Sequence, residues 1–162
     1  MNQNHSKQLR VLAIAPSSRG FGFALLEQPG TLVDWGHKPV KGDKNAQSLK
    51  KLSALIKLCQ PELIVLEDAM KEVRRSARIQ ELGEQIATLA AKESIKVKVL
   101  SRKKVRAVFF TDGEGTKQEQ AELLAARFPD ELGSRLPPKR KPWKSEDSRM
   151  DIFDAVALAV AF

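Results

Sequence analysis

The chain has 162 residues, 42% of them hydrophobic, and a formal net charge of +8. This length suits a single domain spanning residues 1–162, and the apolar content is too high for a chain that is disordered throughout. No apolar run approaches the roughly 20 residues that cross a bilayer, and Met1–Lys7 lacks the apolar core of a signal peptide. The single cysteine, Cys59, excludes an intrachain disulfide and a four-cysteine zinc site. We therefore expect a cytoplasmic protein without a membrane segment, whose positive charge favours a polyanionic partner such as nucleic acid.

The first third of the chain predicts three strands joined by tight turns. Arg10–Ala15 is a short apolar run that Pro16 ends, and Phe21–Leu26 is a second such run. Thr31–Val40 follows the Pro-Gly turn and alternates loosely. Three neighbouring strands with short connections indicate an antiparallel meander.

The middle of the chain changes period. Lys44–Cys59 has apolar residues at helical spacing, and Gln60-Pro61 ends that helix. Leu63–Leu66 is a continuous apolar run, typical of a strand that is buried on both faces. A helix between two strands predicts a crossover to a parallel neighbour.

The remaining pattern predicts helices, one further strand and a loop. The predicted elements are a helix over Val73–Glu93, a strand over Val97–Leu100, helices over Lys103–Phe110 and Lys117–Phe128, an exposed basic loop over about 129–148, and a buried final helix over Arg149–Phe162. Three antiparallel strands followed by two parallel ones, with helices on both faces, describe the α/β fold with the mixed five-stranded sheet of the RNase H-like class.

Three carboxylates are candidates for metal binding. Asp151 and Asp154 lie three residues apart on one face of an otherwise apolar helix, where two like charges lose hydration and repel. Glu67 directly follows the buried strand Leu63–Leu66, and the ends of parallel strands are where ligands gather. Oxygen ligands of this kind favour Mg²⁺ or Mn²⁺.

Three segments resemble those of RuvC-type Holliday junction resolvases. Val11–Phe23 is similar to their first strand and turn, and Ile64–Ala69, Ile-Val-Leu-Glu-Asp-Ala, is similar to their second motif. Asp151–Ala159 resembles their final helix. The order and spacing of these segments fit over nearly the whole chain.

The resemblance implies a homodimeric, metal-dependent endonuclease that nicks four-way DNA junctions symmetrically. It implies that Glu67, Asp151 and Asp154 hold the metal ions, and that Arg106 and Lys117 offset charge on the scissile phosphate. Met70 stands where an aromatic residue often wedges between bases, although filling the core is an equal alternative for methionine.

Ala15 departs from the family pattern, which has aspartate at the end of the first strand. Alanine has no ligand atom, so activity is expected to be lost or impaired. Either Ala15 is an inactivating replacement, or it is native and the protein binds branched DNA without cutting it. The related sugar kinase and actin-like fold is disfavoured, because it needs two such domains with phosphate-binding glycine turns.

Two basic clusters are candidates for DNA contact. Arg74, Arg75 and Arg78 follow Glu67 on a predicted helix, where an ordinary solvated face is an equal alternative. The second cluster, rich in charge around one aromatic residue, consists of Lys139, Arg140, Lys141, Trp143 and Lys144. It predicts phosphate contacts with Trp143 stacking on a base or sugar, against the alternative of a solubilising loop with Trp143 packed on the core.

Overall fold

The computed structural model describes residues 8–68 and 77–162. The strands are β1 (Arg10–Ser17), β2 (Gly20–Glu27), β3 (Thr31–Pro39), β4 (Leu63–Glu67) and β5 (Lys96–Leu100). The helices are α1 (Lys44–Cys59), α2 (Ala77–Lys92), α3 (Arg102–Phe109), α4 (Lys117–Arg127), α5 (Pro129–Leu132), the 3₁₀ turn η2 (Gly133–Arg135) and α6 (Met150–Ala161).

The sheet has the strand order β3-β2-β1-β4-β5. β1, β2 and β3 pair antiparallel, while β4 lies parallel to both β1 and β5. This confirms the predicted RNase H-like sheet of three antiparallel strands followed by two parallel ones.

The prediction that Pro16 ends the first strand is wrong, because β1 continues to Ser17. Pro16 pairs with Phe21 of β2, whereas the ladder between β1 and β4 stops at Ile14 and Leu66. Proline removes one backbone donor, which is tolerated where no partner strand needs it. Beyond Ile14 the end of β1 therefore extends past its ladder with β4.

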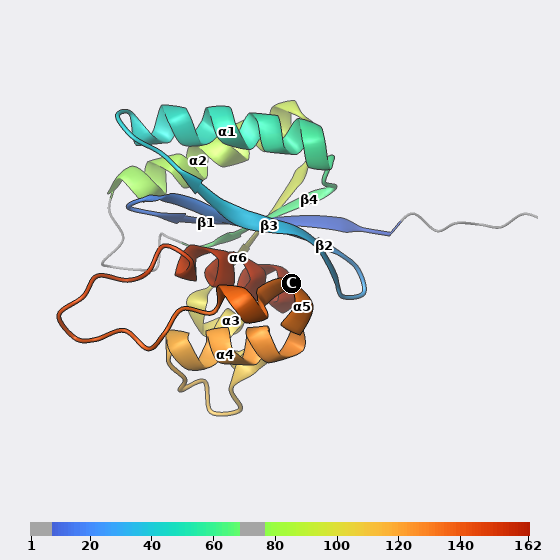
Figure 1. Cartoon of the computed structure of the whole chain (residues 1–162). Coiled ribbons are helices and arrows are strands. Elements are labelled where there is room, and N and C mark those ends of the chain that lie inside the picture. Colours follow the sequence, from blue (N-terminus) through green and yellow to red (C-terminus); the bar gives the residue numbers. More distant parts are fainter. Residues whose placement is uncertain (1–7, 69–76) are drawn as a thin grey trace, which may run out of the picture.

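Helices cover both faces of the sheet, as Figure 1 shows. α1 and α2 lie on one face, where they bury alternate residues of the strands such as Leu12, Ile14 and Ile64. α6 lies directly on the other face with α3, α4 and α5 beyond it, over Val11, Ala13 and Val65. The alternation follows from the period of two in a strand, which sends neighbouring side chains to opposite faces.

The helix α1 has the bounds that the sequence predicts, and its ends explain why. Asp43 accepts a hydrogen bond from the backbone N–H of Ala46, which is the usual role of an aspartate before the first helical turn. Gln60 adopts a left-handed conformation (φ 47°) and closes the last turn, and Pro61 follows it. For α2 only the part from Ala77 is described. The predicted start at Val73, together with Met70, Arg74 and Arg75, lies outside the described residues.

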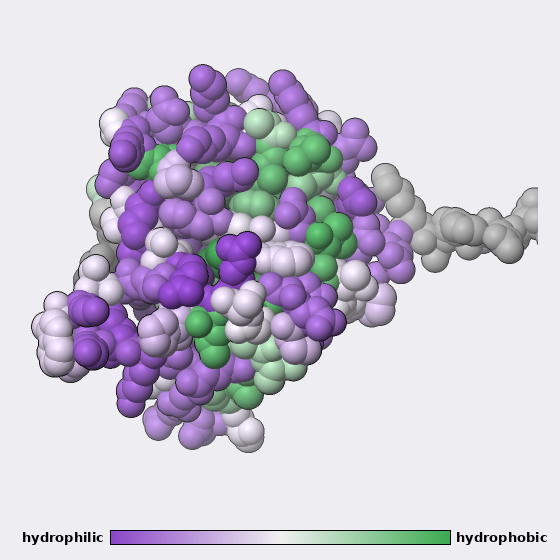
Figure 2. Space-filling view, in the orientation of Figure 1, coloured by the Kyte–Doolittle hydropathy of each residue, from purple (hydrophilic) through white to green (hydrophobic). Residues whose placement is uncertain are grey.

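The prediction of one exposed loop over about 129–148 is partly wrong. Its first part forms α5 and η2, because Leu132 is fully buried and Leu136 packs against the same core. The exposed part is residues 138–145, which we call the basic loop. It stands out from the body beside α6 (Figure 1), and its hydrophilic projection is visible at the left of Figure 2.

Within residues 8–68 and 77–162, no helix combines the length and the apolar character that crossing a membrane requires.

Candidate active site at the ends of β1 and β4

A cleft of about 420 Å³ opens between the ends of β1 and β4 and the helices of the α6 layer. Its polar lining comes from β1, β4, α3, α4, α6 and the segment before α6. These polar residues are Ser17, Glu67, Arg102, Arg106, Thr116, Lys117, Gln120, Glu146, Asp151 and Asp154. The cleft therefore brings together Glu67, Asp151 and Asp154, as the sequence predicts.

Gly22 allows the first turn of α6 to lie against the sheet. A Cβ atom at Gly22 would come within 1.9 Å of the backbone oxygen of Asp151, so only glycine permits this approach. Gly22 pairs with Ala15 on one side and with His37 on the other. The carboxylate of Asp151 is thus placed over three neighbouring strands.

Asp151 is buried, with 2% of its side chain exposed, and it is held from both ends of its carboxylate. Its Oδ2 accepts a hydrogen bond of 2.6 Å from the Ser17 hydroxyl and lies 3.1 Å from Nε2 of His37. Its Oδ1 accepts a hydrogen bond of 2.8 Å from the Arg19 guanidinium. A buried carboxylate is tolerated when such partners replace its water.

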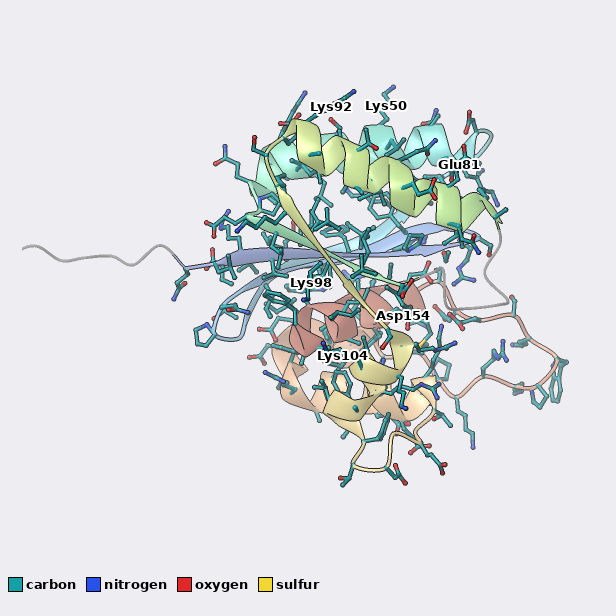
Figure 3. The ribbon with its side chains drawn as sticks, turned by 180° about the vertical axis from the view of Figure 1, so that it is seen from behind. Lys50, Glu81, Lys92, Lys98, Lys104 and Asp154 are labelled. Atoms are coloured by element: carbon teal, nitrogen blue, oxygen red, sulfur yellow. The ribbon has the colours of Figure 1, made fainter. Side chains whose placement is uncertain are left out.

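Asp154 lies one helical turn further along α6 and has a different environment. Figure 3 shows it below the sheet, close to the end of β5 and the beginning of α3. Lys117 Nζ donates to its Oδ2 at 3.1 Å. Burial raises the pKa of Asp154 above its ordinary value, and Glu146 and Asp151 add to this, while Lys117 opposes it.

Glu146 is the third carboxylate of the cluster. It lies 3.5 Å from Lys117 Nζ and 3.6 Å from the Arg19 guanidinium. Glu146, Asp151 and Asp154 each offer an oxygen within 4.8 Å of the others, a grouping that could hold a metal ion. Glu67 lines the same cleft but is not a member of this compact group.

Ala15 lies on β1, two residues before Ser17, and offers no ligand atom. It is 8% exposed and belongs to the apolar core on the α6 side of the sheet, with Ala13 and Ile152. The position at which the family resemblance expects a metal-bridging aspartate is therefore apolar.

The residues present do not fit a pair of divalent ions. Ala15 supplies no oxygen, both oxygens of Asp151 already face protein donors, and Asp154 is paired with Lys117. Arg19 and Lys117 offset two of the three negative charges, and Nε2 of His37 lies 3.1 Å from Asp151. Protein cations thus fill much of the electrostatic role that metal ions have in acidic sites.

Lys117 and Arg106 line the cleft, and Arg102 adds a third cation there. Contact of Lys117 and Arg106 with a phosphate stays a prediction. Arg78 is engaged inside the protein. Its guanidinium donates to Asn45 and to the backbone oxygen of Ser17, each at 3.0 Å. These bonds tie α2 to α1 and to the end of β1, and contact of Arg78 with DNA stays a prediction.

The basic loop presents its aromatic residue to solvent. Trp143 is 77% exposed, and Lys141 lies over its ring with Nζ at 5.6 Å from the centroid. The alternative in which Trp143 packs on the core is therefore wrong. A role of the loop in binding nucleic acid stays a prediction.

Four polar residues of the site were missed by the sequence reading, namely Ser17, Arg19, His37 and Glu146. Ser17 is the last residue of β1, and Arg19 lies in the turn that follows it. His37 reaches Asp151 through the strand register, and Glu146 comes from a segment that the sequence describes as solvated. No periodicity in the sequence could have identified these two.

No family model and no curated protein match the chain. Solved structures do match its fold. RuvC of Thermus thermophilus aligns with a TM-score of 0.68 at 15% identity, over 94% of this chain and 92% of that one. The same protein in complex with a Holliday junction substrate gives 0.69 at 16% identity, again over 94% and 92%. The yeast mitochondrial Holliday junction resolvase Ydc2 gives 0.64 at 15% identity, over 95% of this chain and 77% of that one. The resemblance to RuvC-type resolvases is thus confirmed at the level of the fold.

Proposed function

We propose that this chain binds branched DNA, with four-way junctions as the preferred form, and that its nuclease centre is inactive or strongly impaired as it stands. One observation carries the proposal. In a RuvC-like fold, the position of the first catalytic aspartate is the apolar Ala15, while Asp151 and Asp154 are paired with Arg19 and Lys117. The solved structures of similar fold include one with a Holliday junction substrate, which supports the choice of ligand.

Binding would rest on cations that surround the cleft. Arg102, Arg106 and Lys117 line it, and the basic loop projects beside it. Lysine and arginine contacts to phosphates release counterions, which gives affinity without dependence on base sequence. The exposed Trp143 provides a flat surface on which a base or sugar can stack.

A second candidate is a working metal-dependent endonuclease, and the joint presence of Glu67, Asp151 and Asp154 in one cleft favours it. Their oxygen ligands would select Mg²⁺ or Mn²⁺, which supplies Lewis acidity to phosphodiester hydrolysis when bound. Because the present residues do not fit a pair of ions, this candidate requires Arg19 and Lys117 to release the carboxylates.

The substitution Ala15→Asp separates the two candidates. It returns the missing carboxylate, and we expect Mg²⁺-dependent nicking of a synthetic four-way junction to rise by roughly 100-fold or more, the usual scale for one electrostatic element of a site. Adding Glu67→Gln or Asp154→Asn to Ala15→Asp should abolish the gain. The unchanged chain should bind the junction and nick it at the background rate.

Two results would contradict this assignment. Brisk nicking by the unchanged chain would show that Ala15 is not a missing ligand position and would favour the working enzyme. An Ala15→Asp variant that binds junction and Mg²⁺ but never nicks would show that the site has decayed beyond one residue.

Salt titration tests the basic loop. Replacing Lys139, Arg140, Lys141 and Lys144 together by alanine should reduce the slope of log affinity against log salt by up to about 0.9 for each phosphate contact that is lost. A control that removes the same charge elsewhere replaces four exposed lysines, Lys50, Lys57, Lys92 and Lys96. Equal slopes for the two quadruple variants would remove the loop from the DNA interface.

We also propose a cytoplasmic homodimer, since a four-way junction has two symmetric strands for two matched sites. Light scattering at micromolar concentration should give twice the mass of one chain. A monomer both with and without junction DNA would overturn this.

A further inference from the structure

Of the three clustered carboxylates Glu146, Asp151 and Asp154, Glu146 lies furthest from its cationic partners. It lies 3.6 Å from the Arg19 guanidinium and 3.5 Å from Lys117 Nζ. The same two cations approach the aspartates more closely, with 2.8 Å between Arg19 and Asp151 and 3.1 Å between Lys117 and Asp154. Lys117 Nζ donates to both oxygens of Glu146 at 3.5 Å, which is long beside the roughly 2.7–2.9 Å typical of charge-assisted hydrogen bonds, so Glu146 is held less tightly than either aspartate.

Neither cation engages Glu146 in a short hydrogen bond. Nε of Arg19 is buried and has no hydrogen-bond partner among the described residues. Lys117 has three N–H donors, and it donates to Asp154 at 3.1 Å and to Glu146 only at 3.5 Å. The side chains of Arg19, Lys117 and Glu146 are each about one-third exposed, so this corner of the cleft is open to solvent.

Glu146 lies between the exposed basic loop and a hydrogen-bonded turn at the beginning of α6. The preceding residues 138–145 form the exposed basic loop. Asp147 directly follows, and its carboxylate accepts hydrogen bonds from the backbone N–H of Arg149 at 2.9 Å and from its guanidinium at 2.8 Å. Movement of Glu146 therefore needs rearrangement of the loop alone, while α6 stays in place.

A carboxylate and a phosphodiester each carry one negative charge and offer two charged oxygens. An exchange of one for the other between Arg19 and Lys117 keeps the charge of the site unchanged. We propose that Arg19 and Lys117 form a binding site for one phosphodiester of the DNA backbone, and that Glu146 occupies this site until DNA displaces it. This inference rests on the proposed function and adds a specific phosphate site with its internal occupant.

The exchange also couples the cleft to the basic loop. When a phosphate displaces Glu146, the C-terminal end of the loop loses its contact with the cleft. The basic loop, with Trp143, can then move to contact the bound DNA strand. Glu146 acts in this way as an internal competitor that lowers the affinity of the cleft for DNA, because an incoming phosphate has to displace it.

The test compares Glu146→Gln with Asp147→Asn, which removes the same charge one residue away. Fluorescence anisotropy with a labelled four-way junction and a linear duplex, in EDTA, measures DNA affinity without metal ions. Glu146→Gln should bind both DNAs about fivefold more tightly, as expected when one partly exposed competing ion pair is lost. Asp147→Asn should change affinity by less than about twofold, since its partner Arg149 lies outside the site.

A second pair of variants tests the site itself. When Arg19 or Lys117 is first replaced by glutamine, the increase in DNA affinity caused by Glu146→Gln should shrink to that caused by Asp147→Asn. The reason is that the Glu146 carboxylate then has one cation fewer to bind. Thermal unfolding of Arg19→Gln and Lys117→Gln shows whether each variant is folded. The same result in both variants separates loss of the phosphate site from a folding defect in one of them.

The outcomes separate this inference from the proposed function. Equal gains from Glu146→Gln and Asp147→Asn, or a gain that persists in both backgrounds, would overturn the phosphate site while leaving branched-DNA binding intact. Weaker binding by Glu146→Gln that appears only with Mg²⁺ would assign Glu146 as a metal ligand instead. A fivefold gain without any preference for the junction over the duplex would support the phosphate site and overturn the proposed function.

Discussion

The two aspartates of α6 lie three residues apart, yet they occupy two different regions of the molecule. Asp151 faces the antiparallel half of the sheet, where Ser17, Arg19 and His37 enclose it and 2% of its side chain is exposed. Asp154 faces α4 and the cleft, where Lys117 is its hydrogen-bond partner among the described residues and 25% of its side chain is exposed. Both oxygens of Asp151 accept hydrogen bonds, whereas Asp154 accepts one through Oδ2 and is partly exposed to the cleft.

The difference teaches that equivalent positions in a sequence pattern need not have equivalent roles. Asp151 acts as a fixed connection between α6 and the first three strands, because each of its oxygens already has a partner. Asp154 keeps unused acceptor capacity and faces the cleft with Lys117, Arg106 and Arg102. The Asp151 region thus has the contacts of a structural connection, and the Asp154 region faces the cleft together with its cations.

The sharpest way to break the Asp151 region is to block the approach of α6 to β2. In Gly22→Ala the added methyl would lie 1.9 Å from the backbone oxygen of Asp151, so the helix or the strand has to move. We expect a loss of about 3 kcal/mol in the free energy of unfolding, at the upper end for overpacking. The matched control is Gly83→Ala in α2, where a Cβ meets nothing within 4 Å and should stabilise the helix by about 0.5–1 kcal/mol. Urea unfolding of both variants measures the difference, and similar values for the two would contradict the close packing.

A milder test removes the charge of Asp151 and leaves its shape. Asp151→Asn places an amide N–H₂ among donors, so Arg19 or Ser17 loses its acceptor. We expect a loss of about 2 kcal/mol, less than for a fully buried pair because 31% of the Arg19 side chain is exposed. Asp154→Asn, the matched change in the open region, should alter stability by less than about 1 kcal/mol. Equal losses for the two aspartates would show that the regions do not differ as described.

The smallest expected effect is a pH dependence that belongs to Asp154 alone. Its pKa is raised in the folded chain by burial, so above the ordinary pKa of aspartate the folded chain holds a proton that the unfolded chain has lost. Stability from this group is therefore fully present below the ordinary pKa and falls as pH rises through the window between the ordinary and the folded values. The free energy of unfolding of Asp154→Asn should rise relative to that of the unchanged chain as pH rises through that window. Urea unfolding from about pH 4 to about pH 8 measures the gain. A constant difference across the range would contradict the raised pKa.

Much of the fold follows from local patterns in the sequence. The bounds of α1 match their prediction because Asp43 and Gln60 terminate the helix by short-range bonds. The buried run Leu63–Leu66 is recognisable as a central parallel strand because it is apolar on both faces. The error at 129–148 has the opposite cause. Pro129 and Gly133 suggest a loop, but burial of Leu132 in the core holds the segment in helical turns.

The succession of the five strands along the chain, the carboxylates Glu67, Asp151 and Asp154, and the lack of a ligand atom at Ala15 can all be predicted from the sequence. These features depend on residue identity and on spacing within single elements. Tertiary structure alone decided that Arg19, His37 and Glu146 join this cluster, since β1, β3 and the segment before α6 meet only through sheet register and the close approach at Gly22. It also decided that Asp151 is enclosed and Asp154 is open, because the partners of each carboxylate lie 37 to 134 residues away along the chain. Contacts at such distances follow from the packing of the whole domain, which no local pattern encodes.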